Sequence, residues 1–148
     1  MRKFVLDTNL YIAALRGREA SARLLSFEDE TLPRIHFHAV VAQELLAGAV
    51  SAERRRALYH AYIRPFDRRR RLVTPSFRAW RRAGEVVSEL VERGTFSPGG
   101  FSRSFLNDVL LAASCREEGL TLVTANTADF AAIAEVEPFD FAAPWPAG

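Results

Sequence analysis

The sequence contains a single cysteine, Cys115, and this excludes an internal disulfide bond. So few thiols fit a reducing compartment, and we expect a cytoplasmic protein. The sequence also has no apolar run close to the roughly 20 residues that a membrane-spanning helix needs. The apolar run that follows Met1 is too short for a secretory leader. Disulfide-rich secreted proteins and membrane-spanning proteins are therefore not expected.

The signatures of several common binding sites are also missing. The three histidines, His36, His38 and His60, lack zinc-ligand spacing with the cysteine. The glycine-containing stretch 94–103 lacks the Gly-Lys-Ser/Thr sequence of a phosphate-binding P-loop, and no site for an organic cofactor is expected. No repeat, low-complexity tract or linker divides the chain, so residues 1–148 are expected to form one domain.

Charged residues of both signs are numerous but unevenly distributed along the chain. The net charge is only +2, and apolar residues make up 49% of the chain, enough for a substantial core. Residues 51–103 hold 13 arginines against 5 acidic residues, a local charge of +8, so the rest of the chain carries −6. A basic middle beside acidic ends suits a polyanion that approaches a carboxylate site.

Short apolar stretches alternate with amphipathic ones along the whole chain. Strands are expected at residues 3–7, 34–38, 71–74, 120–124 and 138–141. Helices are expected at residues 10–15, 19–27, 39–47, 53–66 (ended by Pro65), 76–93 and 104–118. The alternation predicts an α/β fold with a central parallel sheet of four to five strands and helices on both faces. Phe77, Trp80 and Cys115 are expected in the core.

Polar side chains interrupt the most apolar stretches, at or near the predicted strand ends. Asp7 and Asn126 follow strands, and Glu44 and Asp108 lie inside apolar helical stretches. A lone buried carboxylate is unfavourable unless a cation or donor compensates it, yet no Lys or Arg lies within four residues of Glu44 or Asp108. A shared divalent metal is the simplest compensation, and oxygen-only ligands favour Mg²⁺ or Mn²⁺.

A site of this kind suits metal-assisted cleavage of phosphodiester bonds. Asp7 and Asp108 can hold the metal, and Glu44 can complete its shell or accept a proton from water. Because the carboxyl ends of parallel strands meet at one edge of a sheet, these three acids are expected to converge there. Hydrogen-bonding support for the carboxylates is expected from Thr8, Asn9 and Thr124.

The order of these motifs resembles that of the PIN-domain ribonucleases, and most closely the VapC-type toxins of type II toxin–antitoxin pairs. The resemblance runs from Phe4 to about Phe141 and is most specific at its two ends. These are Val5-Leu6-Asp7-Thr8-Asn9 and the stretch from Asn107-Asp108-Val109 to Asn126-Thr127-Ala128-Asp129-Phe130. It implies a single PIN-like domain that is a Mg²⁺- or Mn²⁺-dependent endoribonuclease. The implied partners are an RNA substrate, a cognate antitoxin, and a second copy of the chain in a homodimer or toxin–antitoxin hetero-oligomer.

The resemblance also assigns the site residues. By motif position, Asp7, Glu44 and Asp108 are the invariant acids of the nuclease site. The fourth position is commonly Asp, and here it is occupied by Asn126. Asp129 stands three residues later and can supply the charge that the amide lacks.

Each residue also has a simpler interpretation. Asp7 and Asp108 can be helix caps, Glu44 can face water, and Asn126 and Asp129 can be turn residues. The run Arg68, Arg69, Arg70, Arg71 can be a solvated surface or can contact RNA or a protein partner.

Other functions stay open at this point. A housekeeping RNA-processing nuclease would need the same site. A phosphatase with Asp7 as nucleophile is less favoured, because Asn9 stands where such enzymes usually have a second Asp. A non-catalytic RNA-binding module is suggested only by Asn126. The small size of the chain favours the toxin, and a neighbouring gene for a DNA-binding antitoxin would distinguish it from a housekeeping enzyme.

Overall fold

The computed structural model describes residues 1–147 and is built around a five-stranded parallel sheet in the order β3-β2-β1-β4-β5. Every neighbouring pair of strands is parallel, which confirms the predicted sheet. The strands are β1 (Lys3–Leu6), β2 (Ile35–His38), β3 (Leu72–Val73), β4 (Leu120–Val123) and β5 (Phe141–Ala142). The last strand begins at the final residue of its predicted range.

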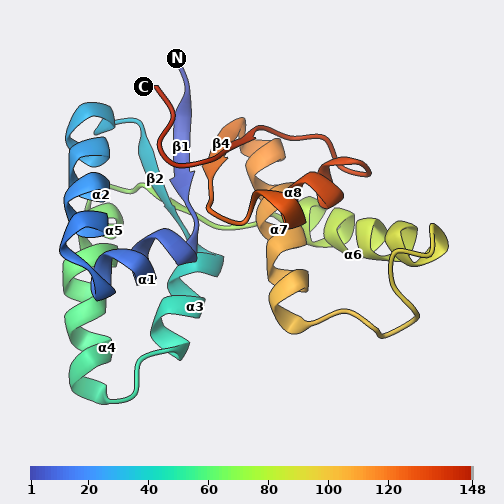
Figure 1. The fold of residues 1–148 in the computed structure, drawn as a ribbon, viewed down its shortest axis with the longest axis horizontal. Coiled ribbons are helices and arrows are strands. Elements are labelled where there is room, and N and C mark those ends of the chain that lie inside the picture. The colour runs from blue at the N-terminus through green and yellow to red at the C-terminus, as the bar shows by residue number, and fades with distance from the viewer. Residues whose placement is uncertain (148) are drawn as a thin grey trace.

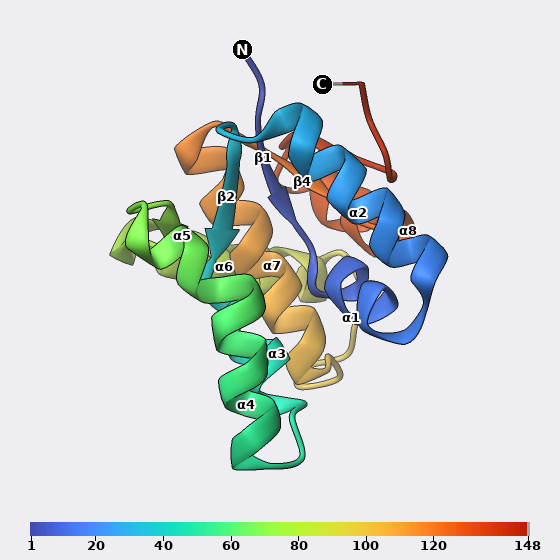
Figure 2. The same cartoon turned by 90° about the vertical axis from the view of Figure 1, so that its left-hand side faces the viewer.

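Helices cover both faces of the sheet, as Figures 1 and 2 show. One group comprises α1 (Thr8–Arg16), α2 (Arg18–Thr31), α4 (Ala52–Leu58) and α5 (Arg64–Arg68). The other comprises α6 (Phe77–Glu92), α7 (Arg103–Glu118) and α8 (Thr127–Ala134). Helix α3 (Ala39–Ala47) continues directly from β2 and lies between the two groups. None of the helices in the described part of the chain is long and apolar enough to cross a membrane.

Strands β1 and β4 are buried except for Lys3 at the start of β1, and they set the register of the polar residues that follow them. Phe4, Val5 and Leu122 have no exposed surface, as expected for parallel strands covered on both faces. Leu6 pairs with Val123, so the next residues, Asp7 and Thr124, emerge side by side at the carboxyl edge of the sheet.

Two local predictions are wrong. Pro65 does not end the helix predicted at 53–66, because α4 passes through a π-helical segment, η1 (Tyr59–Ile63), into α5. Pro65 lies in the first turn of α5, where a helix has no use for the backbone N–H that proline lacks. Helix α8 was also not expected, and it begins directly after Asn126.

The core prediction for α6 is wrong as well. Phe77 is 77% exposed and Trp80 is 58% exposed. The helix instead buries a stripe of smaller side chains, Ala79, Ala83, Val86, Val87 and Leu90. Cys115, in contrast, is fully buried in the core, as predicted.

Candidate active site

Asp7 lies at the point where β1 ends and α1 begins, and its side chain is only 4% exposed. Oδ1 accepts a hydrogen bond from the Thr8 backbone N–H at 2.8 Å. Oδ2 accepts from Thr124 Oγ1 at 2.7 Å and from Asn9 Nδ2 at 3.0 Å. Burial raises the pKa of Asp7, and the hydrogen bonds from Thr124 and Thr8 offset part of this effect. Asp7 therefore caps α1 and is also held in a fixed orientation.

Thr124 and Asn9 join the ends of β1 and β4. The Thr124 hydroxyl, which donates to Asp7, accepts from the Asn126 backbone N–H at 3.0 Å. Asn9 Oδ1 accepts from the Ala125 backbone N–H at 3.2 Å. These hydrogen bonds connect the two strand ends. They therefore fix the Asp7 carboxylate relative to residues 124–126, the loop that leads to α8.

Glu44 reaches the same region from α3. Its Oε1 accepts from Thr8 Oγ1 at 2.7 Å, and its Oε2 lies 3.5 Å from Asn107 Nδ2 of α7. The first bond ties Glu44 to the residue after Asp7, and the second links it to the residue before Asp108. Glu44 thus lies between the two other acids and does not simply face water.

Asp108 projects from the middle of α7, five residues after the helix begins, so it is not a helix cap. Ser102 has that role instead, and its hydroxyl accepts from the Phe105 N–H. Burial raises the pKa of Asp108 to about 8, and the charges of three other carboxylates, Asp7, Glu44 and Asp129, add to the shift. Three acids from other parts of the chain thus lie close enough to Asp108 to disfavour its charged form.

Two neighbouring residues, Asn126 and Asp129, lie where the fourth acid of the site was predicted. Asn126 is the residue before α8, and its Nδ2 donates to Asp129 Oδ2 at 2.9 Å. Asp129 is exposed in the first turn of α8, where the positive end of the helix dipole favours a carboxylate. The amide therefore orients the acid, and Asp129 supplies the charge at this side of the site.

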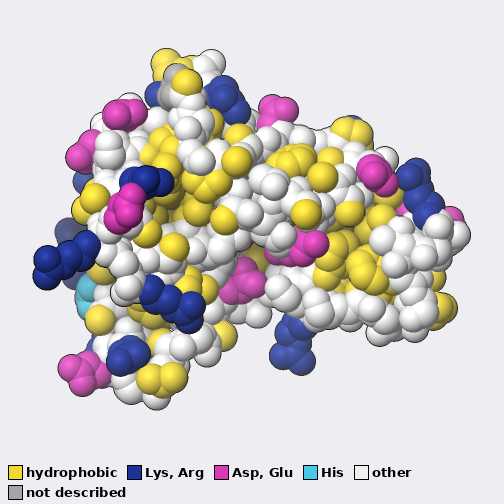
Figure 3. Space-filling model, viewed as in Figure 1, with side chains coloured by type: hydrophobic (Ala, Val, Ile, Leu, Met, Phe, Trp, Pro, Cys, Tyr) yellow, Lys and Arg dark blue, Asp and Glu magenta, His cyan; other side chains and the backbone are white. Residues whose placement is uncertain are grey.

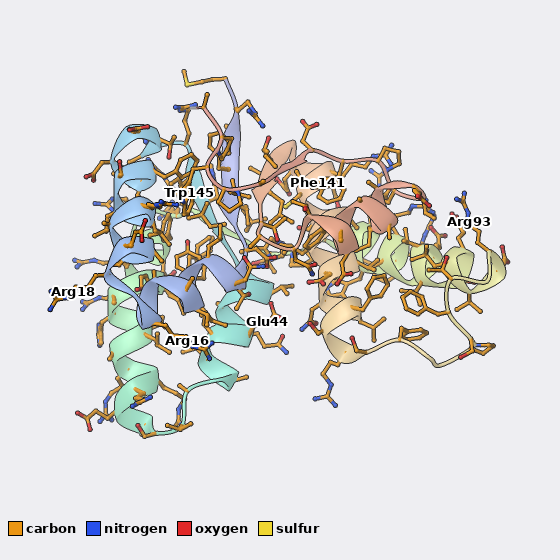
Figure 4. The ribbon with its side chains drawn as sticks, in the orientation of Figure 1. Arg16, Arg18, Glu44, Arg93, Phe141 and Trp145 are labelled. Atoms are coloured by element: carbon orange, nitrogen blue, oxygen red, sulfur yellow. The ribbon has the colours of Figure 1, made fainter. Side chains whose placement is uncertain are left out.

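The acids form a shallow hollow on one face of the molecule. In the space-filling view, acidic side chains gather at the centre of this face, between α3 and α7 (Figure 3). Glu44 projects into the space between these two helices (Figure 4). The carboxyl edge of the sheet forms the floor of this space, because Asp7 and Thr124 emerge there.

None of the four acids is paired with a cation within the part of the chain that the structure describes. Within residues 1–147, no ion pair to Lys or Arg involves Asp7, Glu44, Asp108 or Asp129. The available donors are carboxylate, amide and hydroxyl oxygens, which suit Mg²⁺ or Mn²⁺. No three acid, His or Cys side chains of the described residues are close enough together to enclose an ion as they stand. The donor set therefore fits a hard divalent ion, and closing its shell would require side-chain movement.

Residues 4–136 match the PIN domain family. The chain belongs to the PIN-domain family. The match spans the whole sheet except β5 and includes every acid of the site.

Several solved structures share this fold. The PIN domain superposes on a chain of DNA-bound VapBC from Salmonella typhimurium with a TM-score of 0.74 at 20% identity, covering 97% of this chain and 98% of that one. FitAcB from Neisseria gonorrhoeae gives 0.68 at 18% identity, with 97% and 99% covered. VapBC-1 from nontypeable Haemophilus influenzae gives 0.64 at 19% identity, with 95% and 96% covered. Comparison with curated proteins gives no significant match.

The arginine run lies apart from the acids of this PIN domain. Arg71 directly precedes β3, at the amino end of an edge strand two strands away from β1. Arg68, Arg69 and Arg70 are exposed at the end of α5 and in the turn after it. The acids follow the carboxyl ends of the strands, so any RNA that contacts the run must extend beyond the hollow.

Two supporting residues were not anticipated from the sequence. His38 is fully buried at the end of β2, where its Nδ1 accepts from the Val40 N–H at 3.1 Å. Its Nε2 therefore carries the proton and donates to Ser114 Oγ of α7 at 2.9 Å. Burial lowers the pKa of His38 to about 4. This neutral pair joins the start of α3 to α7, the two helices that carry Glu44 and Asp108. Its position at the end of a predicted strand was the signal available in the sequence.

Proposed function

We propose that this PIN domain is a metal-dependent endoribonuclease that acts as the toxin of a toxin–antitoxin pair. The observation that carries the proposal is a cluster of four carboxylates for which the described chain supplies no cation. Membership in the PIN-domain family supports nuclease chemistry at this cluster. Buried structural acids are normally paired, so an unpaired cluster favours a bound cation and an anionic substrate.

Asp7, Glu44 and Asp108 would hold a divalent ion, with Asp129 beside them. A bound Mg²⁺ or Mn²⁺ supplies positive charge to a phosphate oxygen and lowers the pKa of a water molecule. Asp7 is suited to fixed ligation because three donors already orient it. Asp108 is suited because burial, and after it the charges of the neighbouring acids, raise its pKa, and a bound cation would favour its ionised form.

The remaining polar groups would orient the reacting acids. Thr8 and Asn107 hold the two oxygens of Glu44, which keeps this carboxylate directed between Asp7 and Asp108. Glu44 is only half-buried, unlike Asp7, and can accept a proton from the attacking water. Asn126 keeps Asp129 at the α8 side of the hollow, where it can bind water or a second ion.

The hydrogen bonds to Asp7 argue against a phosphatase with an aspartate nucleophile. Both of its carboxylate oxygens already accept hydrogen bonds, and Asn9, two residues later, donates to it rather than acting as an acid. Such a phosphatase usually has a second acid at the position of Asn9, and an amide cannot take part in proton transfer in its place. A metal ligand keeps such neutral donors as supporting contacts.

A protein partner is proposed on two grounds. The similar solved structures are VapBC and FitAcB complexes. In addition, a cavity of about 660 Å³ lies beside the acids, lined by Ile12, Leu15, Leu45 and Tyr62 together with Arg16 and Glu44. An apolar segment of an antitoxin would fill this cavity. An arginine from that segment, placed next to Glu44, would neutralise the acids in place of a metal.

The metal requirement can be tested without relying on cleavage alone. RNA cleavage should require Mg²⁺ or Mn²⁺ and stop in excess EDTA. Either ion should also raise the melting temperature by a few degrees, because a ligand that binds only the folded state stabilises it. Asp108→Asn should abolish both effects. Cleavage that persists in EDTA would exclude the metal mechanism, whereas a metal-induced shift without cleavage would leave a metal-binding domain of another function.

The toxin assignment requires a separate experiment. Expression of the chain alone should slow growth, and co-expression of the antitoxin from the neighbouring gene should restore it. The Asp7→Asn form should be harmless at the same expression level. Equal, harmless expression of both forms would contradict toxicity and would favour a housekeeping nuclease if cleavage in vitro persists.

A further inference from the structure

The cavity of about 660 Å³ shares a wall with the acid cluster. Its lining residues come from α1, α3, α4 and the π-helical segment η1, and Glu44 is one of them. The same Glu44 accepts a hydrogen bond from Thr8, the residue after Asp7. The cavity therefore lies directly beside the groups to which the proposed function assigns the cleavage, where a part of the substrate next to the cleaved bond would lie.

The lining of the cavity is largely apolar and includes one aromatic ring. Ile12, Leu45 and Leu58 contribute aliphatic side chains, and Tyr62 of η1 contributes the ring. Tyr62 is half-buried and packs edge-to-face on the fully buried Tyr11, with the ring centroids 5.3 Å apart. This contact holds the ring in place at the cavity wall. π-Helical segments such as η1 often occur at functional sites.

Two arginines line the same cavity. Arg16 is the last residue of α1, Arg54 belongs to α4, and both are exposed. Neither forms an ion pair within residues 1–147, although Glu44 lines the same cavity. Arg16 lies on the Glu44 side of α1, whereas Arg18 projects from the outer edge of the molecule (Figure 4). Unpaired guanidinium groups beside an apolar cavity suit the binding of phosphate.

On the basis of the proposed nuclease function, we propose that this cavity binds one nucleotide of the RNA strand, next to the cleaved phosphate. The base enters the cavity and stacks on Tyr62, and Arg16 and Arg54 bind phosphates of the same strand. Proteins commonly recognise single-stranded RNA by stacking its bases on aromatic side chains. The cavity has room for a purine, so we expect a purine, with its larger stacking surface, to bind more tightly than a pyrimidine.

An antitoxin segment is the competing occupant of this cavity. An apolar segment with an arginine would use the apolar lining and Glu44, but it gives no role to Arg16 and Arg54. A nucleotide combines an aromatic face with a phosphate, so it accounts for Tyr62, the apolar lining and both arginines. We therefore favour the nucleotide, and an antitoxin that entered the cavity would exclude it.

The first test is the binding of a single nucleotide, which requires no cleavage. Adenosine 5′-monophosphate should shift the NMR signals of Leu45 and Ala57, and ribose 5-phosphate, which lacks a base, should bind at least about tenfold more weakly. Ala57→Trp fills the cavity from an exposed position of α4 and should abolish binding of the nucleotide. Ala52→Trp, exposed on the same helix but not among the lining residues, is the matched control and should leave binding unchanged.

The aromatic ring can be tested with a matched pair of substitutions. Tyr62→Leu should weaken the binding of adenosine 5′-monophosphate about tenfold, because it removes the stacking surface. Tyr62→Phe keeps the ring and should bind the nucleotide as the natural chain does. Urea unfolding of both variants checks that the fold is intact. Undiminished binding by a folded Tyr62→Leu variant would overturn the proposal.

The second test uses a short RNA with a mapped cleavage position. An abasic residue is placed at each position around the cleaved bond in turn. One position next to that bond should lower kcat/KM about tenfold or more, and Ala57→Trp should lose this sensitivity. Arg16→Ala should raise KM and flatten the slope of log affinity against log salt by about 0.7, with little change in kcat. Arg18→Ala is the matched control and should change neither quantity.

These tests separate failure of the nucleotide site from failure of the proposed function. Metal-dependent cleavage would leave the nuclease intact, but equal binding of ribose 5-phosphate or unchanged nucleotide binding by Ala57→Trp would overturn the site. So would an Ala57→Trp variant that binds RNA normally and no longer binds the antitoxin, because the cavity would then serve the antitoxin alone. A chain that cleaves no RNA with any metal would instead contradict the proposed function, and with it a site next to the cleaved bond.

Discussion

Two carboxylates in this PIN domain are almost completely buried, and their surroundings are opposite. Glu137 is 3% exposed and forms ion pairs with Arg82, at 3.0 Å, and with Arg116. Asp7 is 4% exposed, and it accepts hydrogen bonds from three neutral donors, a backbone amide, a side-chain amide and a hydroxyl. The first acid is neutralised within the chain. The second remains in a cluster of further acids.

This difference separates structural acids from functional ones more clearly than burial does. Glu137 lies after α8, and its two arginines belong to α6 and α7, so the ion pairs tie three parts of the chain together. Removing one partner of such a group leaves a buried charge unpaired. Asp7 has hydrogen bonds that orient it but no opposite charge, which is the condition expected of a metal ligand before the metal binds.

The largest expected effect is on catalysis when Asp7 is replaced. Asp7→Asn keeps the shape of the side chain and should lower kcat/KM for RNA cleavage by on the order of 10²-fold or more, because it removes a negative charge that a metal requires. Its unfolding free energy should stay within about 0.5 kcal/mol of the natural chain, since the repulsion it relieves offsets the altered hydrogen bonds. Steady-state kinetics and urea unfolding measure the two quantities. Full activity of this variant would remove Asp7 from the site.

Glu137→Gln should have the reverse profile. It leaves Arg82 and Arg116 without their shared carboxylate and should lower the unfolding free energy by about 2–3 kcal/mol, less than a fully buried pair would, because both arginines are partly exposed. Cleavage per folded molecule should be unchanged. A variant that loses activity while keeping its stability would contradict the separation of the two acids.

Glu28 provides a third case, a half-buried acid that lies away from the site and forms no ion pair within residues 1–147. Burial raises its pKa to about 7, above the ordinary 4.5, and the neighbouring Asp29 adds to the shift. The folded state therefore binds the proton more tightly than the unfolded state does. The contribution of Glu28 to the unfolding free energy is lost as pH rises from about 4.5 to about 7. Glu28→Gln should be more stable by on the order of 2 kcal/mol at pH 8, and this gain should vanish near pH 4.5.

The measurement for Glu28 is urea unfolding of both proteins across this pH range. Glu30→Gln, at an exposed position of the same helix α2, is the matched control and should show no such dependence. If the gain from Glu28→Gln were equal at every pH, its cause would be packing and not ionisation.

The sequence was sufficient to predict the sheet, and the shared metal site of the acids at its edge stays a prediction that rests on the same reasoning. Asp7 and Glu44 interrupt apolar stretches of the sequence, and the parallel order of the strands brings the strand ends together. The hydrogen bonds from Thr8 and Thr124 follow from the same edge. The metal itself and the role of each acid in cleavage stay predictions.

Other features could not be read from spacing alone. The period of α6 shows that Phe77 and Trp80 share a side, but it does not tell whether that side or the stripe of Ala79 and Ala83 enters the core. Helix α8 was missed because Asn126 and Asp129 are also favoured in turns. An Asn followed three residues later by an acid is, however, also typical of a helix start, and that signal was available.

The smallest expected effect concerns arginines, and it extends the comparison of paired and unpaired charges to the cations. Arg82 and Arg116 have carboxylate partners, whereas Arg68 and Arg69 take part in no ion pair among residues 1–147. If they contact the RNA backbone, each phosphate contact contributes about −0.7 to the slope of log affinity against log salt for a single strand. Replacing both with Ala should therefore flatten the slope by roughly one unit and weaken binding equally for all sequences, because backbone contacts carry no sequence information. The cleavage position should not move. Arg55→Ala with Arg56→Ala on α4 is the matched control, and an equal slope in all three proteins would assign the run to solvent or to the antitoxin.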